Sequence, residues 1–440
     1  MRLKIYIFLF SIISGIISAQ NPISPPGVYL ADPSAHVWNT GKLYIYGSLD
    51  ESCNYYCSNR HHVMSTDNLK NWQLHKNALV SAGEGDGISY NDNVLYAPDV
   101  AYKRDTFYMY YCQPGNKFAE GVATSLNPTG PFKNGINIHL NGYNQIDPAV
   151  FTDDDGQSYY LWGQFTLKMA KLKPNMKELD MSSLRDSILT EGSHHFHEGA
   201  FLTKRAGIYY LVFADISRGD APTCLGYATS KSPFGPYKYG GVIIDNNYCN
   251  PGNWNNHGSI AEFKGKWYVF YHRSTHGCNT MRKACMEPIS FNPDGSIPEV
   301  EMTSQGAGDP LNPLITIQAE WACLLSGNLR ISQFAKEEEE LGMINNGDKF
   351  CFKYIDFNKG TKSLTIKYLS SGKTGKLQVY IDKPWHMKIA ETDIKSSAEN
   401  LKWQTITVPV EKVSGIHSLW FLFNATEEKG VLSIDWLRFN

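Results

Sequence analysis

The sequence carries little net charge, because 41 Lys and Arg residues nearly balance 43 Asp and Glu residues and leave a formal charge of −2 at pH 7. This balance predicts no nucleic-acid partner and no attraction to an anionic membrane surface. Long apolar runs are scarce as well: after the first twenty residues none approaches the roughly 20 residues that span a bilayer. Helical periodicity is also lacking, so we expect an all-β protein.

The single long apolar run lies at the start of the chain, in MRLKIYIFLFSIISGIISAQ. Arg2 and Lys4 precede it, it ends at Ile17, and small residues of a cleavage site follow. This order predicts a secretory signal peptide over residues 1–19. The run is too short for a membrane anchor, and no cysteine follows for lipid attachment. We therefore expect export to the periplasm or the outside, without a membrane anchor.

Nine cysteines are spread along the chain, and the odd number leaves at least one thiol unpaired. A chain of this size does not depend on a disulfide framework for its core. Cys53 and Cys57, followed by His61 and His62, resemble half of a zinc site, but no second pair completes it. A local disulfide or two buried thiols is the favoured interpretation.

One pattern recurs five times: a polar residue, a short apolar run, a turn with Gly, Asp or Asn, and a Tyr-rich apolar strand. The copies begin at Asp32 (DPSAHVWNTGKLYIYG), Asp99 (DVAYKRDTFYMYY), Asp147 (DPAVFTDDDGQSYYLWG), Glu198 (EGAFLTKRAGIYYLVF) and His257 (HGSIAEFKGKWYVFYH). Their spacing of roughly 50 to 65 residues is near that of propeller blades with about four strands each. Residues 20–300 are therefore expected to form a five-bladed β-propeller. A solenoid is the alternative, disfavoured because the intervals vary and no helix recurs.

The first residues of the five copies should meet at one point, because the innermost strand of each propeller blade lines the central axis. Four of these residues are acidic and the fifth is a histidine. Like charges that converge raise one another's pKa, a cost that is usually tolerated where it serves chemistry. The funnel is therefore the candidate site.

The composition shifts to Ser, Gly, Pro and Asp over residues 301–316, which predicts a linker. Residues 317–440 then alternate in strand-like runs such as KSLTIKYL and WQTITVPV, so a β-sandwich of jelly-roll type is expected. The acidic run Lys336–Glu340 (KEEEE) is interpreted as a solvated surface.

Five motifs in the first domain, in the same order, give it a resemblance to glycoside hydrolase family 43. They are ADPSA at Ala31, YAPDV at Tyr96, IDPAVFTDDDGQSYYLWG at Ile146, HEGAFLTKRAGIYYL at His197 and NHGSIAEFKGKWYVFYHR at Asn256. The resemblance covers roughly residues 25–300 and implies a five-bladed propeller glycosidase. The related sucrose- and fructan-cleaving propellers carry Asn-Asp-Pro and Arg-Asp-Pro motifs that this chain lacks.

The resemblance implies that Asp32 is the general base that activates water and that Glu198 is the general acid. Asp147 would be the third carboxylate, which orients the acid and raises its pKa. Members of the family invert the anomeric centre, so acid and base should lie about 6.5–9.5 Å apart, with room for a water.

Other positions are also implied by the resemblance. His257 matches a histidine that contacts a calcium ion in the funnel, often through water, and also borders the substrate. Arg282 lies where the family often places an arginine near the substrate, and Asp99 is expected to be structural. Apart from the resemblance, several aromatic residues lie near the motif ends, and of these Trp162, Phe196 and Trp254 are expected to line the pocket.

The tail resembles a family 6 carbohydrate-binding module. The matching pieces are QAE at Gln318, GDKFCFKYIDF at Gly347, WQTITVPV at Trp403 and IDWLRF at Ile434. The resemblance implies a structural calcium held by Glu320 and Asp435. Trp403 and Trp385 could stack on sugar, whereas Phe350 replaces the usual ligand-stacking Tyr or Trp. A purely structural sandwich packed on the propeller is the alternative.

The combined expectation is a monomeric, exported, inverting exo-glycosidase that removes α-L-arabinofuranosyl side chains from a plant polysaccharide. Within the enzymes, the alternatives are a β-xylosidase and an exo-β-1,3-galactosidase. Outside them, a non-catalytic sugar-binding propeller remains, although it predicts that one of the three acids is lost. Ca²⁺ is the one expected cofactor, and an oligo- or polysaccharide is the one expected partner.

Overall fold

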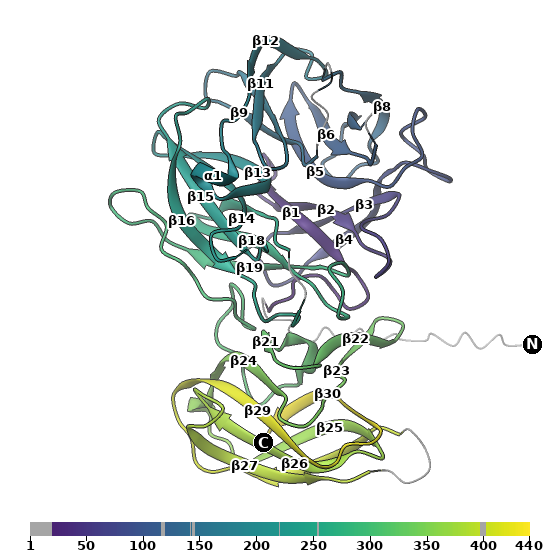
Figure 1. Cartoon of the computed structure of the whole chain (residues 1–440), viewed down its shortest axis with the longest axis vertical. Coiled ribbons are helices and arrows are strands. Elements are labelled where there is room, and N and C mark those ends of the chain that lie inside the picture. Colours follow the sequence, from purple (N-terminus) through teal and green to yellow (C-terminus); the bar gives the residue numbers. More distant parts are fainter. Residues whose placement is uncertain are drawn as a thin grey trace, which may run out of the picture.

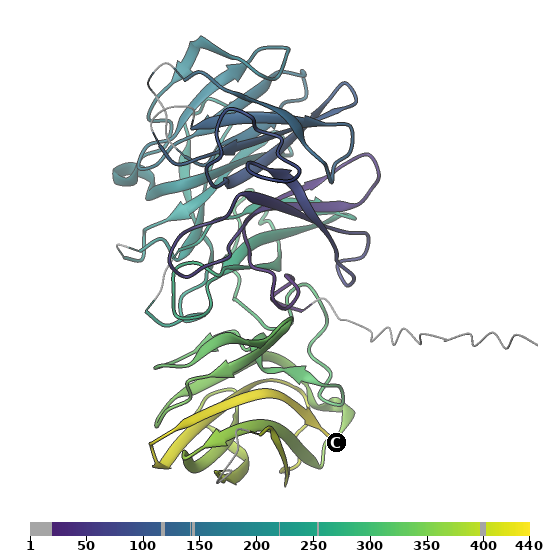
Figure 2. The same ribbon diagram turned by 90° about the vertical axis from the view of Figure 1, so that its right-hand side faces the viewer.

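The computed structural model describes residues 20–115, 119–140, 142, 146–219, 221–252, 255–396 and 402–440. The proposed signal peptide, residues 1–19, and Trp254 therefore lie outside the described residues. The chain folds into two all-β parts, with strands β1 to β19 in one and β20 to β30 in the other (Figures 1 and 2). The one α-helix in the described ranges is α1, Glu191–His194.

The first part consists of five antiparallel sheets, each formed by strands in sequence order. The first sheet contains β1 (Leu30–Val37), β2 (Leu43–Leu49), β3 (Arg60–Thr66) and β4 (Gln73–Val80). The second contains β5 (Tyr96–Lys103), β6 (Thr106–Cys112), β7 (Glu120–Ser125) and β8 (Lys133–Asn137). The third contains β9 (Ala149–Thr152), β10 (Ser158–Trp162), β11 (Lys168–Leu172) and β12 (Leu179–Arg185). The fourth contains β13 (Phe196–Arg205), β14 (Ile208–Asp215), β15 (Cys224–Ser230) and β16 (Lys238–Asp245). The fifth contains β17 (Ser259–Phe263), β18 (Lys266–Arg273) and β19 (Lys283–Ile289).

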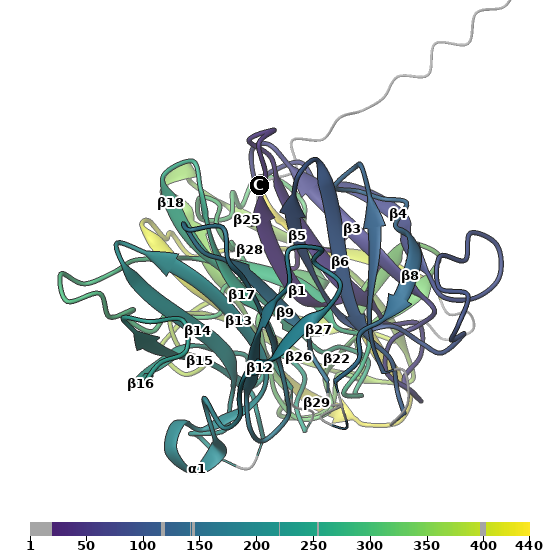
Figure 3. The same ribbon diagram turned by 90° about the horizontal axis from the view of Figure 1, so that it is seen from above.

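These sheets form a closed ring around their first strands. Each first strand contacts the next, β1 with β5, β5 with β9, β9 with β13 and β13 with β17, and β17 returns to β1. Figure 3 shows these strands toward the middle of the ring. A separate hydrophobic cluster fills each gap between neighbouring sheets; the one between the fifth and first includes Leu30, Met64, Phe270 and Met286. The five-bladed propeller is confirmed.

Residues Asn21–Ser24 close the ring by lying along β19. The Ile23 amide donates to the Ala284 carbonyl (2.8 Å), and the Asn21 side chain donates to the Met286 carbonyl (2.9 Å) while accepting from the Met286 amide (2.8 Å). The N-terminal segment thereby covers an edge that the three-stranded fifth sheet would otherwise expose.

The second part is a sandwich of two sheets. One has the order β22 (Arg330–Ala335), β23 (Glu338–Gly342), β30 (Val431–Phe439), β25 (Ser363–Ser371) and β28 (Gln404–Pro409), with β20 (Ile317–Gln318) also paired to β30. The other has the order β21 (Leu324–Leu325), β24 (Lys349–Asp356), β29 (Ile416–Glu427), β26 (Thr374–Ile381) and β27 (Met387–Ile394). Two single 3-10 turns, η1 (Ala319–Trp321) and η2 (Phe357–Lys359), complete it.

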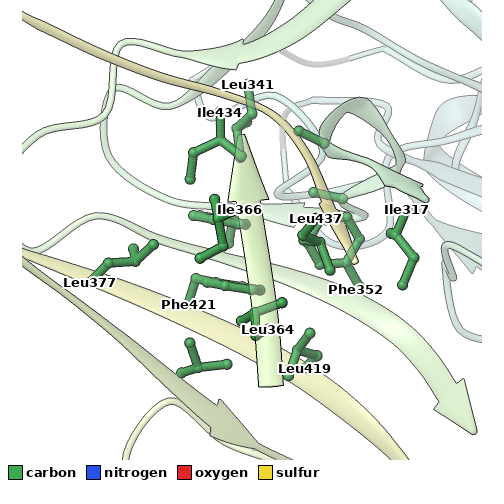
Figure 4. Close-up of a cluster of buried hydrophobic side chains, with 14 of the residues drawn as sticks. Ile317, Leu341, Phe352, Leu364, Ile366, Leu377, Leu419, Phe421, Ile434 and Leu437 are labelled. Carbon is green, nitrogen blue, oxygen red and sulfur yellow. The ribbon is translucent and has the colours of Figure 1, made fainter. Parts of the chain in front are cut away.

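Strict alternation in the sequence builds the sandwich core. In β25 every second side chain is buried, including Leu364 and Ile366, because successive side chains of a strand point to opposite faces. These two residues face Leu419 and Phe421 of the other sheet (Figure 4). The β-sandwich expectation is confirmed. In the described part of the chain, no helix is both long and apolar enough to cross a membrane.

The segment 301–316 contains no strand, but it is not a free linker. The Thr303 amide donates to Glu287 of the propeller (2.7 Å), and the Ser304 amide donates to the Lys353 carbonyl of the sandwich (2.6 Å). Leu311 is buried in the sandwich core. The polar composition of this segment predicted a linker. The structure shows that its buried contacts join the propeller to the sandwich.

Candidate active site

The three predicted catalytic carboxylates lie at the starts of inner strands. Asp32 is in β1, Asp147 lies two residues before the start of β9, and Glu198 is in β13. The pairing register shifts beside Asp32 and on both sides of Glu198, as it does at a β-bulge, which redirects a side chain. Asp32 and Asp147 also have left-handed backbones, with φ of 51° and 60°. Such conformations are uncommon outside glycine and cluster at functional sites.

Asp32 is buried among groups that stabilise its charge. Its Oδ1 accepts from Arg282 (2.8 Å), and its Oδ2 accepts from the Ser48 hydroxyl (2.7 Å). The Nδ1 atoms of His257 and His272 each lie 3.6 Å from Oδ1. Burial alone would raise the pKa of Asp32, but Arg282, the two histidines and Ser48 together lower it to about 2. Asp32 is therefore ionised at neutral pH, as a general base must be.

Arg282 is the fixed partner of Asp32. Its Nε and Nη2 donate to the two oxygens of Asp50 (2.8 and 2.9 Å), and the remaining Nη1 points to Asp32. A bidentate carboxylate pair of this kind holds the guanidinium in one orientation. The prediction placed Arg282 near the substrate; the structure shows it bonded to Asp32, the predicted base.

Asp147 lies within electrostatic range of the other two carboxylates. Its amide donates to the Cys112 sulfur (3.3 Å), and its Oδ2 is 3.9 Å from His257. Burial, followed by the charges of Glu198 and Asp32, raises the pKa of Asp147 well above its usual range. Glu120 adds to this effect; it is itself buried, and burial raises its pKa to about 8.

Glu198 is the most accessible of the three acids. Its side chain is 22% exposed, against 7% for Asp32 and 9% for Asp147. Gln164 donates to its Oε2 (2.7 Å), and His197 lies 3.9 Å from the same atom. A carboxyl group that is partly exposed to solvent can meet the oxygen of a leaving group, which is the requirement for a general acid.

His257 packs between the acids. A Cβ on Gly199, the residue after Glu198, would come within 2.8 Å of the imidazole ring, and Gly199 has a φ of 66°. Glycine is therefore required beside the acid. Burial lowers the pKa of His257, which favours the neutral ring.

Asp99, the acid of the second blade, is held by three hydrogen bonds. Its partners are Ser34, His36 and the Val150 amide, each at 2.6 Å, in keeping with the expected structural role.

Two of the predicted pocket aromatics are corrected by the structure. Trp162 is fully buried in the core between the second and third blades, and Phe196 in the core between the third and fourth. Neither side chain can contact a sugar. Their places at strand ends suggested the funnel, but side-chain alternation turns both rings into blade interfaces.

The aromatic rings on the funnel rim come from loops instead. Tyr56 is 41% exposed, and its ring centre is 5.1 Å from the Arg282 guanidinium. Burial raises the pKa of Tyr56, and the charge of Glu198 adds to the rise, so this ring lies within electrostatic range of the acid. Phe165 is 50% exposed and contacts His197 edge-on at 5.3 Å.

Sequence reasoning missed these rim residues together with Asp50 and Gln164. Asp50 directly follows β2, and Gln164 comes two residues after β10. A second strand runs antiparallel to the inner strand, so its last residues return to the funnel end. A search for polar residues just after the second strand of each repeat would have identified both Asp50 and Gln164.

Replacing Tyr56 by alanine should weaken substrate binding. By analogy with stacked aromatic pairs, a ring that stacks on a sugar should contribute on the order of 0.5–1.5 kcal/mol, so KM for an oligosaccharide should rise about 2- to 12-fold while kcat changes little. Steady-state kinetics measures both constants. Leu126→Ala is the control, because Leu126 is 76% exposed and follows β7, whose start and not its end lies at the funnel. Equal KM values for Tyr56→Ala and wild type would contradict this assignment.

A disulfide bond fixes the rim loop. Cys53 pairs with Cys278, 225 residues away, whereas Cys57 is a buried free thiol, so the predicted local disulfide is wrong. The bond joins the loop after β2 to the loop before β19. The Thr280 hydroxyl strengthens the same junction by donating to the Ser52 carbonyl (2.7 Å).

The predicted calcium ligands of the sandwich lie near each other. Glu320 is buried, and its Oε2 has no hydrogen-bond partner. Burial raises the pKa of Glu320 to about 8, and the charges of Glu339 and Asp435 add to the rise. Asp435 accepts from Lys367 (2.6 Å). An unpartnered carboxylate oxygen near a second carboxylate fits Ca²⁺, which takes carboxylate and carbonyl oxygens.

Within the described ranges, no three or more His, Cys, Asp or Glu side chains form a group that could hold a metal. A calcium ion on the sandwich would therefore need carbonyl oxygens or water besides Glu320 and Asp435. The water-mediated calcium contact of His257 stays a prediction.

Comparison with known proteins agrees with this geometry. The sequence model for glycosyl hydrolases family 43 matches residues 19–297, and that for the family 6 carbohydrate binding module matches residues 319–440. A xylosidase/arabinosidase of Thermoclostridium stercorarium is 30% identical, over 92% of this chain and 96% of its own. An arabinoxylan arabinofuranohydrolase of Bacillus subtilis is 28% identical, over 93% of this chain and 90% of its own.

A crystal structure aligns with nearly the whole chain. It is that of a family 43 arabinoxylan arabinofuranohydrolase from Bacillus subtilis in complex with cellotetraose, 26% identical, with a TM-score of 0.56 over 97% of this chain and 98% of its own. The family match covers well over half of the chain, and the propeller carries its acids in one funnel. The chain therefore belongs to glycosyl hydrolase family 43 and is an inverting glycoside hydrolase.

Proposed function

We propose that this protein removes α-L-arabinofuranosyl side chains from arabinoxylan, one residue at a time. The observation that carries the proposal is the pairing of an ionised, arginine-bound Asp32 with the accessible acid Glu198 in one funnel. The choice of sugar is supported by relatives that match both domains, one named a xylosidase/arabinosidase and one an arabinoxylan arabinofuranohydrolase.

In the proposed reaction, Asp32 accepts a proton from a water as the water oxygen attacks the anomeric carbon. Glu198 donates its proton to the glycosidic oxygen, and the bond from that oxygen to the anomeric carbon breaks. The sugar leaves with an inverted anomeric centre. Proton exchange with solvent then returns Asp32 to its ionised and Glu198 to its protonated form. Asp147 and His257 orient both groups in this proposal, since His257 lies 3.6 Å from Asp32 and 3.9 Å from Asp147.

A panel of p-nitrophenyl glycosides tests the choice of sugar. We expect release of p-nitrophenol from the α-L-arabinofuranoside at least tenfold faster than from the β-D-xyloside or the β-D-galactoside. The β-xylosidase alternative is supported by the Thermoclostridium stercorarium relative, which is named a xylosidase as well as an arabinosidase. It predicts faster release from the β-D-xyloside than from the α-L-arabinofuranoside. Background rates on every glycoside and on arabinoxylan, by wild type and Glu198→Gln alike, would support the sugar-binding propeller instead.

We also propose that the sandwich binds the polysaccharide through the outer face of β26 and β29. Tyr380 and Trp420 are direct cross-strand neighbours there, and both are partly exposed. Asn424 donates to the Gln378 side chain (2.9 Å) beside them. Trp403 is less suited, because the Lys367 ammonium lies over its ring at 5.3 Å.

Replacing Trp420 by alanine should weaken retention of the full-length protein in an arabinoxylan affinity gel, because the aromatic platform is lost. Activity on a p-nitrophenyl glycoside, which is too small to reach the sandwich, should be unchanged. Trp385→Ala is the comparison, since Trp385 is highly exposed on the turn between β26 and β27. If Trp385→Ala lost retention in the gel and Trp420→Ala did not, the polysaccharide would bind at that turn and not at the face of β26 and β29.

We propose a structural Ca²⁺ held by Glu320 and Asp435. Saturation with calcium should stabilise the wild type by about 2.7 kcal/mol at a hundredfold excess over Kd. Thermal unfolding in calcium and in EDTA measures the shift, which should disappear in Glu320→Gln and persist in the exposed-site control Glu411→Gln. If the wild-type protein had the same Tm in calcium and in EDTA, the proposed calcium site would be refuted.

Export of the chain also remains a proposal. The Cys53–Cys278 disulfide supports it, because structural disulfides persist in oxidising compartments. N-terminal sequencing of protein recovered from the culture medium or periplasm should find Gln20 as the first residue. Retention of residues 1–19 would contradict cleavage.

A further inference from the structure

The sandwich contacts the loop that carries Arg282. This loop, residues 274–282, connects β18 to β19 and lies against the β22–β23 hairpin. The His276 amide donates to the Ile331 carbonyl (2.8 Å), and the Gln333 amide donates to His276 Nε2 (3.2 Å). The start of the loop is therefore bonded to the sandwich through backbone and side chain.

A second contact holds the end of the loop. The Lys283 ammonium donates to both oxygens of Glu339, at 2.8 and 2.6 Å, and the two side chains are 2% and 0% exposed. The Gly27 amide also donates to Glu339 (3.2 Å), and the Tyr29 ring lies 5.5 Å from the ammonium. Glu339 belongs to the KEEEE run, so the interpretation of that run as a solvated surface is wrong at this position.

Lys283 follows Arg282 directly, and consecutive side chains near a strand point to opposite sides. Arg282 points into the funnel toward Asp32 and Asp50, whereas Lys283 points out to the sandwich. The backbone between them is shared, and the Arg282 amide itself donates to Asp50 (3.0 Å). A displacement of Lys283 would therefore displace Arg282.

We infer that Glu339 is a positioning residue for catalysis: the sandwich, through Lys283 and the 274–282 loop, holds Arg282 on the general base. Without Glu339, the Pro25 carbonyl at 3.3 Å and the Tyr29 ring are the contacts that the described residues leave to the buried ammonium. A buried cation without its anionic partner moves toward water. A shift of about 1 Å in a catalytic group can cost about 100-fold in rate. The inference rests on the proposed role of Asp32.

The first test measures kcat and KM of full-length variants on a p-nitrophenyl glycoside that the wild type cleaves. This substrate does not report sugar binding by the sandwich. Glu339→Gln should lower kcat at least tenfold and change KM less than twofold, whereas the exposed neighbour Glu338→Gln should match wild type. In an Arg282→Ala background, Glu339→Gln should cause no further loss, because its effect passes through Arg282.

His276→Ala, which removes the other loop contact at a partly exposed position, is made alongside in case Glu339→Gln does not fold. It should lower kcat in the wild-type background and leave the Arg282→Ala rate unchanged. Wild-type kcat in a folded Glu339→Gln, or equal fold-losses in both backgrounds, would overturn the inference while leaving the proposed role of Asp32 intact.

Hydrogen exchange gives a readout that does not depend on activity. The amides of residues 276–283 should exchange faster in Glu339→Gln or His276→Ala, and at the wild-type rate in Glu338→Gln. Unchanged exchange in the first two variants would overturn the inference whatever the enzyme proves to cleave. Increased exchange together with an active Asp32→Asn would instead refute the proposed catalytic base and, with it, the catalytic role of Glu339.

Discussion

Replacing Glu198 by glutamine is expected to slow hydrolysis of an arabinoxylan oligosaccharide by about 10² to 10⁴, the usual contribution of a general acid. The same change should cost less than about tenfold on a 2,4-dinitrophenyl glycoside, whose leaving group departs without a proton. Asp32→Asn should be slow on both substrates, because water must be activated whichever group leaves. Initial rates for the two variants on the two substrates are the measurement.

This pattern separates the acid from the base, which loss of activity alone does not. The accessible position of Glu198 at the funnel and the arginine-bound, buried position of Asp32 predict the assignment. If the dinitrophenyl substrate restored the hydrolysis rate of Asp32→Asn and not that of Glu198→Gln, Asp32 would be the general acid and Glu198 the general base. Glu178→Gln serves as a control, since Glu178 is exposed and bonded only to Lys173 and Asn175 among the bonds described.

Replacing Arg282 by alanine should move the acidic limb of the pH profile to higher pH. Burial tends to raise the pKa of Asp32, and Arg282 is foremost among the groups that lower it to about 2. Without the guanidinium that pKa rises. A general base works only when ionised, so activity is lost as pH falls through its pKa, and this loss should begin at higher pH in the variant. The pH dependence of kcat/KM measures the shift.

Two further variants sharpen the test of Arg282. Arg282→Lys keeps a positive charge but loses the planar guanidinium that bonds Asp32 and Asp50 at the same time. The acidic limb of its pH profile should therefore lie between the limbs of wild type and Arg282→Ala. Arg60→Ala should leave the profile unchanged, because the Arg60–Glu51 pair is exposed. Acidic limbs that coincide in Arg282→Ala and wild type would contradict the assigned electrostatic role.

The sequence alone was sufficient to predict the propeller and the convergence of its acids, because both follow from a repeated local pattern. Asp32, Asp147 and Glu198 begin copies of that pattern, and the same backbone geometry brings them to one end of the ring. The alternating run in β25 similarly specified a two-sheet core. Local periodicity thus determined the elements and the residues placed at their starts.

Contacts between distant segments could not be predicted in this way. The Cys53–Cys278 bond, the pairing of Arg282 with Asp32 and Asp50, and the burial of Glu339 against Lys283 each join segments at least 56 residues apart. Trp162 and Phe196 were misplaced for a related reason: their sequence position gave the strand end but not the face on which the ring packs.

Time-resolved NMR of arabinoxylan digestion tests the central claim most directly, because it identifies the sugar released, its anomeric form and the state of the xylan chain. Arabinofuranose should appear first in the β configuration, inverted from the α-linked side chain, while the xylan backbone keeps its length. Release of xylose or shortening of the backbone would contradict the proposed specificity, and an α-configured first product would contradict the roles of Asp32 and Glu198.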